Sequence, residues 1–303
     1  SIRELKMSPS AIIRLPVKNI VGESLVWDFR YNRFVWVDII GKFIHAFDPQ
    51  NGKHDSWPTP DFVTSIGLSA DGGYIVGLCH EITLWRPNQE FVSVAIPEAD
   101  IPNNRLNEGV VGPDGAFWVG TMQNNIKSNG DPKEITASTG AIYRVTADGT
   151  VTRISEQTFG ITNTLIWSGD RLITADTIEN KIYSFGIDSS TGMLEDRQTI
   201  LEGFDRGLPD GSTADIDGAF WNCRVVGGAC LLRLSAQGEI LNTVNLPVTW
   251  PTSCAFGGTN LDQLFVTSAR FTMAKDHLDA NPQEGSLVQV DVGVKGTQEN
   301  VFG

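Results

Sequence analysis

The sequence lacks several patterns that would each indicate a particular class of protein. No stretch reaches the roughly eighteen apolar residues needed to span a bilayer, and residues 1–7 contain no apolar core of a signal peptide. There is no run rich in Lys or Arg, and the net charge of −13 repels nucleic-acid phosphates and anionic lipids. We therefore expect no membrane and no nucleic-acid partner, and a cytoplasmic location is the default.

Cysteines, helical patterns and familiar catalytic motifs are also scarce. The four cysteines have no CxxC spacing, which favours buried free thiols over a disulfide framework. The four histidines have no metal-binding spacing, and no GxSxG, HExxH, Walker or GxGxxG pattern occurs in a suitable context. The apolar residues instead alternate, or form runs of three or four between Gly, Asp, Asn and Pro. This pattern is typical of short β-strands.

What the sequence does contain is one pattern that returns six times: a polar residue, then a turn, then an apolar strand. In four copies the polar residue lies seven positions before an Asp. The six leading residues are Glu23, Thr64, Asn107, Asn163, Asp210 and Thr252, of which the first and last begin looser copies. In three copies the turn contains Asp-Gly, at residues 71–72, 114–115 and 217–218, which predicts β-hairpins with type I′ turns.

The repeat predicts an all-β fold. Each copy contains about four short antiparallel strands, and repeats of roughly 40–50 residues are typical of β-propellers. We expect one six-bladed propeller domain over residues 1–303, in which the strand at residues 11–15 completes the last blade and leaves no open edge. The polar insertion at residues 123–139 predicts a long loop that is functional or mobile.

In a propeller the first strand of each blade lines the central channel, so the six polar residues should form a ring at one mouth. The carboxylates of Glu23 and Asp210 would repel each other there unless a proton or a cation intervened. Oxygen ligands favour Ca²⁺, Mg²⁺ or Mn²⁺, and the absence of His and Cys makes Zn²⁺ less suited. The alternative is that these residues only cap strand ends, which is the simpler interpretation of Thr64 and Thr252.

Arg105 lies two residues before Asn107, so the two side chains lie on the same side of a strand. An arginine beside a metal would orient a carbonyl or hydroxyl group of a ligand. A surface salt bridge is the alternative.

Several motifs together resemble the senescence-marker-protein-30, gluconolactonase and luciferin-regenerating (regucalcin-like) family over nearly the whole chain. They include Gly22-Glu23-Ser24, Arg105-Leu106-Asn107, Trp118-Val-Gly-Thr-Met122, Thr162-Asn163, Pro209-Asp210-Gly211 and Pro251-Thr252-Ser253. The resemblance implies a six-bladed propeller with one divalent ion (Ca, Zn, Mn or Mg) held by Glu23, Asn163 and Asp210. It also implies that Arg105 and Asn107 bind the substrate and that the activity is lactone hydrolysis, commonly of sugar lactones.

The chain also departs from the pattern of this family. Glu108 stands where members often have Asp, and residues 123–125 are Gln-Asn-Asn where some members place an acidic substrate-binding residue. Arg224 lies in a segment that often contains small and aromatic residues, and it would meet either an anionic substituent or a surface salt-bridge partner. We therefore expect the metal chemistry to be retained and the substrate pocket to be changed.

The resulting hypothesis is metal-assisted hydrolysis of a sugar lactone to its aldonic acid. Asp210 would be both a ligand and the base that takes a proton from the attacking water. Two alternatives remain open. The same metal site would serve a phosphotriester or other ester hydrolase, and a propeller without catalysis would bind Ca²⁺ or a partner protein. The sequence leaves the oligomeric state, the lactone and the metal undetermined.

Overall fold

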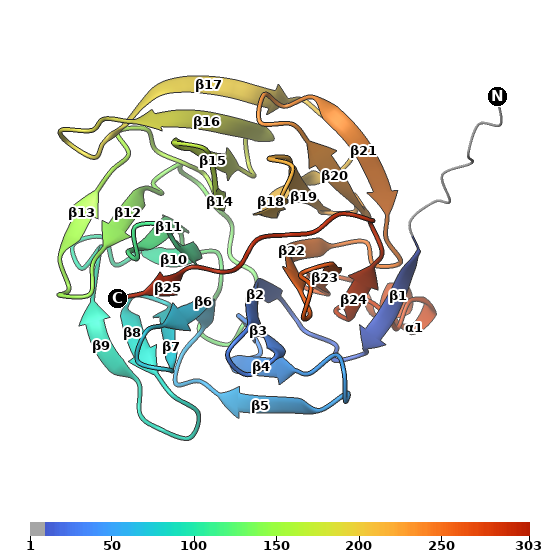
Figure 1. Ribbon diagram of the computed structural model, residues 1–303. Coiled ribbons are helices and arrows are strands. Elements are labelled where there is room, and N and C mark those ends of the chain that lie inside the picture. Colours follow the sequence, from blue (N-terminus) through green and yellow to red (C-terminus); the bar gives the residue numbers. More distant parts are fainter. Residues whose placement is uncertain (1–9) are drawn as a thin grey trace.

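The short apolar runs form antiparallel strands, and the inner strands of each sheet are buried on both faces. In the computed structural model, which describes residues 10–303, these strands assemble into six sheets around a central axis (Figure 1). Both faces are buried because each sheet packs between two neighbours. The arrangement is a six-bladed β-propeller, which confirms the predicted fold class. The prediction about a signal peptide concerned residues 1–7, which lie outside the described part.

In each blade the strand nearest the axis is followed by strands that lie progressively further out (Figure 1). Blade 1 contains β2 (Gly22–Asp28), β3 (Arg33–Asp38), β4 (Phe43–Phe47) and β5 (His54–Pro58). Blade 2 contains β6 (Val63–Ser69), β7 (Tyr74–Leu78), β8 (Ile82–Trp85) and β9 (Val92–Ala95). Blade 3 contains β10 (Asn104–Val111), β11 (Phe117–Gln123), β12 (Ile142–Val145) and β13 (Val151–Arg153).

The second half of the ring follows the same order. Blade 4 contains β14 (Thr162–Ser168), β15 (Arg171–Asp176), β16 (Lys181–Ile187) and β17 (Leu194–Glu202). Blade 5 contains β18 (Leu208–Ala214), β19 (Phe220–Val225), β20 (Cys230–Leu234) and β21 (Ile240–Asn245). Blade 6 contains β22 (Pro251–Gly257), β23 (Gln263–Ser268), β24 (Leu287–Val290) and, outermost, β1 (Ala11–Leu15).

The last blade is completed by the first strand of the chain, as predicted. β1 pairs antiparallel with β24, with Ala11 opposite Val290. The contact between the first and last blades is apolar: Phe34 of blade 1 and Phe265 of blade 6 are both fully buried, and their ring centroids lie 4.2 Å apart. The ring is therefore closed both by strand pairing and by core packing.

The hairpin turns occur where Asp-Gly predicted them, but their type differs. Only the glycines, Gly72, Gly115 and Gly218, have positive φ angles, of 91°, 79° and 81°, whereas a type I′ turn needs two such residues. In two of these turns the preceding aspartate, Asp71 or Asp114, accepts a backbone hydrogen bond through its side chain, and in the third Asp215 does so. The Oδ1 atom of Asp71, for example, accepts a hydrogen bond from the Gly73 amide. The prediction of type I′ turns was therefore wrong.

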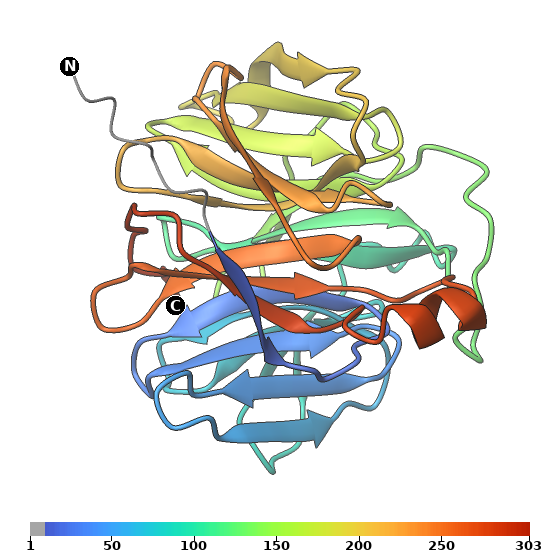
Figure 2. The same cartoon turned by 90° about the vertical axis from the view of Figure 1, so that its right-hand side faces the viewer.

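Two elements were not predicted. The short helix α1 (Lys275–Ala280) lies between β23 and β24. The two-residue strand β25 (Val301–Phe302) pairs in parallel with β6, so the C-terminal segment crosses the face of the propeller (Figure 1). Figure 2 shows this segment on the opposite face from α1 and the loop at 123–139. Within residues 10–303, no helix has the length and apolarity to cross a membrane.

A β-bulge near the start of each innermost strand positions the predicted ring. In all six blades the pairing with the second strand shifts register at or beside the leading polar residue of the repeat. Ser24 and Thr164, which follow Glu23 and Asn163, have φ angles of 57° and 58°, in the left-handed region. A bulge turns the local side chains away from the regular alternation of a strand. The six repeat positions are thus placed at the same level of the channel.

Candidate metal and substrate site

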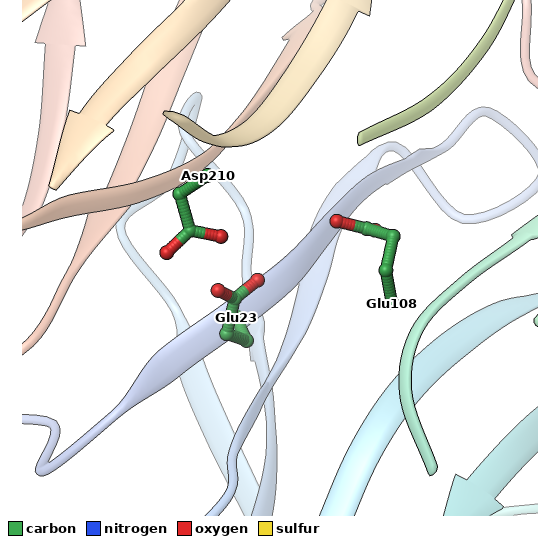
Figure 3. Close-up of side chains that lie close together, drawn as sticks. All are labelled: Glu23, Glu108 and Asp210. Carbon is green, nitrogen blue, oxygen red and sulfur yellow. The ribbon is translucent and has the colours of Figure 1, made fainter. Parts of the chain in front are cut away.

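The site is built around three carboxylates that converge on the axis. One oxygen from each of Glu23, Glu108 and Asp210 lies within 4.8 Å of the others (Figure 3). Glu23 comes from β2, Glu108 from β10 and Asp210 from β18, so three separate blades supply the cluster. Glu23 and Asp210 are buried and Glu108 is partly buried. Such a cluster is unfavourable without a proton or a cation between its members.

One buried oxygen of the cluster has no partner among residues 10–303. The Oδ1 atom of Asp210 makes no hydrogen bond with them, although the residue is only 6% exposed. The carboxylate of Glu23 receives one backbone hydrogen bond, from the Ser24 amide at 3.0 Å. Buried polar atoms are normally paired, so this carboxylate oxygen is free to accept a cation or a proton donor. The oxygen-only donor set fits a hard divalent cation.

Burial and, to a smaller extent, the neighbouring charges raise the pKa values of the three carboxyl groups. Burial is the largest cause for each, and it raises the pKa of the Glu108 carboxyl to about 8, with a further contribution from the charge of Glu23. Burial also raises the pKa of Asp210 to about 8 and that of Glu23 well above its usual range. Without a cation, these carboxyl groups therefore retain protons near neutral pH.

Hydrogen bonds on neighbouring strands hold the site residues in place. The Thr164 hydroxyl donates to the main-chain carbonyl of Asp210, and the Thr164 amide donates to Glu108 at 3.3 Å. This one residue therefore links blade 4 to the carboxylate of Glu108 in blade 3 and to the main chain of Asp210 in blade 5. Gly211 follows Asp210, and a Cβ atom there would lie 2.8 Å from the Thr252 carbonyl, so only glycine fits this close approach of two blades.

Asn163, the predicted third ligand, lines the same cavity as Glu23 and Asp210. Its Nδ2 atom donates to the hydroxyl of Thr177 at 2.7 Å. The segment before it is held by Asp176, whose carboxylate accepts hydrogen bonds from the amides of Gly160 and Ile161 at 2.9 and 3.2 Å. Because Asn163 uses its amide nitrogen inside the protein, its Oδ1 atom is the group available for a cation.

Blade 1 has the same arrangement of an aspartate that accepts backbone hydrogen bonds, here from the segment before Glu23. The carboxylate of Asp38 accepts hydrogen bonds from the amides of Ile20 and Val21 at 2.9 and 3.0 Å. Asp38 and Asp176 are positioning residues to which the sequence analysis assigned no role. Each of the two aspartates ends the second strand of its blade, and this equivalent position in the repeat could have identified them from the sequence.

Arg105 and Asn107 lie together, as their spacing predicted. The Arg105 Nη1 atom donates to the Oδ1 atom of Asn107 at 3.0 Å, and the Nη2 atom donates to the Oδ1 atom of Asn125 at 3.0 Å. Arg105 is only 5% exposed, and its partners are amides and a carbonyl, so the surface salt-bridge alternative was wrong. Asn125 belongs to the loop at 123–139, which therefore contributes to the site.

Thr64 and Thr252 behave as strand caps. The Thr64 hydroxyl donates to the Gly77 carbonyl at 3.2 Å, and the Thr252 hydroxyl donates to the carbonyl of Gly22. Glu108 was the member of the cluster that sequence reasoning missed as a candidate ligand. It follows Asn107 directly, and the bulge in β10 turns it inward where regular alternation would turn it away.

The site residues form the floor of a cavity of about 140 Å³. All five residues predicted to bind metal or substrate line this cavity, together with Asn125, Thr177 and Thr252. Its remaining wall is apolar. A second cavity, of about 340 Å³, lies along the channel toward the C-terminal segment and is lined by Glu108, Trp167 and Glu299. Glu108 therefore lies between the two cavities.

Arg224 has a role that neither sequence alternative described. It is 1% exposed, and its guanidinium group donates to the main-chain carbonyls of Phe204, Arg206 and Gly207 at 3.1, 3.0 and 2.8 Å. It makes no ion pair with a described residue and does not line the cavity of the site. Arg224 therefore holds the segment before β18 in place, and with it the backbone that leads to Asp210.

Replacing Arg224 by Ala should lower the free energy of unfolding by roughly 3 kcal/mol, because three buried carbonyls lose their donor. Urea unfolding with saturating metal measures the change. Arg144→Ala is the matched control: Arg144 forms a partly exposed ion pair with Asp114 at 2.7 Å, and its loss should cost less than about 1 kcal/mol. A normal stability of Arg224→Ala, with a raised KM only for anionic substrates, would instead support the anion-binding role.

The four cysteines, Cys79, Cys223, Cys230 and Cys254, are free and buried, as predicted.

A six-bladed propeller with a cluster of buried carboxylates on its axis is the class that the fold and the site define. The chain matches the family model described as "SMP-30/Gluconolactonase/LRE-like region" over residues 21–270, and it belongs to this family. It is 31% identical to regucalcin of Xenopus laevis over 288 residues, covering 93% of this chain and 94% of that protein. It is also 31% identical to 6-deoxy-6-sulfogluconolactonase of Pseudomonas putida over 297 residues, covering 96% and 97%. Among solved structures, a luciferin-regenerating enzyme superposes with a TM-score of 0.87 at 28% identity, covering 97% and 99%.

Proposed function

We propose that the protein is a metal-dependent lactonase that hydrolyses a sugar lactone to its aldonic acid. The observation that supports this most directly is the buried, unpartnered Oδ1 atom of Asp210, which lies beside Glu23 in a pocket that also contains Arg105. Lactone hydrolysis needs a base for the attacking water and a positive group for the carbonyl oxygen. The floor of the pocket offers residues of both kinds.

Glu23, Asn163 and Asp210 would hold the ion, and the chemistry that it supplies there is polarisation of the lactone carbonyl. Asp210 accepts a proton from water while the water oxygen bonds to the carbonyl carbon. Arg105 and Asn107 orient the substrate through hydrogen bonds to its oxygen atoms. The ring C–O bond then breaks and the proton passes from Asp210 to the leaving oxygen, so that lactone and water become one hydroxy acid.

The relatives support the class of reaction. The name of the Pseudomonas putida relative describes an enzyme that acts on a lactone, and the description of the family includes gluconolactonase. The name of that relative also specifies a sulfonate substituent. In the present pocket Arg105 is the only Lys or Arg among the lining residues, and Asn107 and Asn125 already engage its guanidinium group. A second cation for an anionic substituent is therefore absent from the described lining.

The test is to strip the protein of metal and to assay it after adding Ca²⁺, Mg²⁺, Mn²⁺ or Zn²⁺ singly. The substrates are a panel of aldonolactones and a neutral phosphotriester. We expect lactone hydrolysis with at least one ion and a much lower rate with the phosphotriester. Faster phosphotriester hydrolysis would favour the other hydrolase. Ion binding by calorimetry without turnover of any substrate would favour a calcium-binding propeller.

A further inference from the structure

The wall above the polar floor of the pocket is apolar on every side that the structure describes. It is formed by Ile39 and Ile40 of blade 1, Ile126 of the loop at 123–139, Val226 of blade 5, and Trp250 and Phe271 of blade 6. Ile39 and Ile126 are almost fully buried. Segments from four different blades thus bring alkyl and aromatic groups to the cavity that Glu23 and Asp210 also line.

The polar groups of the floor are largely engaged with one another. Arg105 donates to Asn107 and Asn125, and the Asn107 amide donates to the Thr162 carbonyl at 2.8 Å. The Thr177 hydroxyl donates to the Pro209 carbonyl at 2.8 Å. The floor can bind the lactone group itself. Hydroxyl groups on a substituent outside the lactone ring, however, would meet the apolar wall. Such hydroxyls would lose their hydrogen bonds to water without replacement.

The backbone conformation of Val226 independently indicates that the apolar wall has a functional role. It has a φ angle of 58°, in the left-handed region, where a β-branched residue is strained and Asn or Gly is not. It is followed by Gly227 in the tight turn between β19 and β20, and it remains 48% exposed beside the pocket. Strained residues of this kind concentrate at functional sites. The turn would be more stable with Asn, whereas Val adds an apolar group to the rim.

We infer that the preferred substrate is a lactone whose substituent outside the ring is apolar, such as a deoxy, alkyl or aryl group. The lactone carbonyl lies over Glu23 and Asp210, and the substituent packs against Ile126, Val226 and Phe271. This inference rests on the proposed lactonase function and specifies the class of lactone. It distinguishes the protein from an enzyme for fully hydroxylated aldonolactones.

Two matched pairs of substrates test the inference on the metal-loaded protein. L-Rhamnono-1,4-lactone differs from L-mannono-1,4-lactone only by a methyl in place of a hydroxymethyl group, and δ-decalactone differs from δ-valerolactone by an alkyl chain. We expect kcat/KM to be at least about tenfold higher for the more apolar member of each pair. Equal or higher values for the hydroxylated or unsubstituted members would overturn the inference while leaving the lactonase function in place.

Calorimetry with lactams, which are not hydrolysed, keeps the test independent of turnover. A δ-lactam with a pentyl chain should bind at least about tenfold more tightly than the unsubstituted lactam. If no lactone is hydrolysed, the proposed function fails, and the lactam comparison still decides whether the pocket selects apolar substituents. Equal affinity of the two lactams would overturn the inference.

Val226→Asn tests the wall without threatening the fold, since Asn tolerates the left-handed turn. The KM for δ-decalactone should rise several-fold more than the KM for δ-valerolactone, and the melting temperature should stay the same or increase. Val92→Asn is the matched control, because Val92 is 61% exposed on β9 and does not line the pocket. It should leave both substrates unaffected. Equal effects of Val226→Asn on the two lactones would contradict the inference.

Discussion

Replacing Asp210 by Asn should lower kcat/KM for lactone hydrolysis by roughly 10²- to 10⁴-fold, the range expected when a general base is lost. Asn preserves the size of the side chain but cannot accept the proton of the attacking water. Asp210 is 6% exposed and lies on the short strand β18, between Pro209 and Gly211, so the substitution should not disturb the backbone. The measurement is steady-state kinetics at saturating metal, with circular dichroism to establish the fold.

The matched control is Asp217→Asn, in the same blade. Asp217 lies in the hairpin turn between β18 and β19, and its carboxylate forms an exposed ion pair with Arg233 at 3.1 Å. Its substitution should leave kcat/KM unchanged. A metal titration separates the two roles of Asp210, because loss of the base alone would lower kcat with little change in the affinity for the ion. Undiminished hydrolysis by a well-folded Asp210→Asn protein would exclude the assignment of Asp210 as the base.

Removal of the metal should abolish hydrolysis and make the stability of the protein strongly dependent on pH. In the metal-free protein, burial holds the pKa values of Glu108 and Asp210 at about 8, whereas an unfolded chain has values near 4. The folded state therefore binds more protons than the unfolded state between these pH values. Stability must then fall as pH rises from about 4 to about 8, because deprotonation is easier in the unfolded chain.

Added metal should reverse this trend, since a cation favours the ionised carboxylates and binding releases their protons. An ion at about 1,000 times its dissociation constant stabilises the folded state by about 4 kcal/mol. Melting temperatures between pH 5 and 9, with a chelator and with excess ion, measure both effects. Metal-free Asp210→Asn provides the control, since it should lose part of the pH dependence. A stability of the metal-free protein that rises from pH 5 to 8 would contradict the arrangement of the three carboxylates.

The sequence predicted the fold because propeller blades are built from local hairpins. Strand alternation and the Asp-Gly turns depend on neighbours in the chain, and six copies of one pattern reduce the number of possible architectures. The repeat also located Glu23, Asn107, Asn163 and Asp210 at equivalent positions, and the structure places all four on one cavity. Their chemical roles stay predictions.

Other features depended on contacts that no local pattern encodes. Glu108 faces the channel because the bulge in β10 interrupts the regular alternation, and periodicity cannot show a one-residue insertion. Arg224 looked like a surface or substrate-binding cation, but carbonyls of a segment some twenty residues earlier surround it. The C-terminal strand β25 is too short to have a sequence pattern, and only its partner β6, far away in the chain, makes it a strand.

The sequence by itself thus determined the six-bladed ring and the level at which its polar residues meet. The tertiary structure decided what surrounds them: the third carboxylate, the amide partners of Arg105, and the apolar wall to which Ile126, Val226 and Phe271 contribute from three different blades. The physical reason is that a hairpin repeat is fixed by interactions between chain neighbours. A pocket on the axis is instead formed by side chains that become neighbours only when the ring closes.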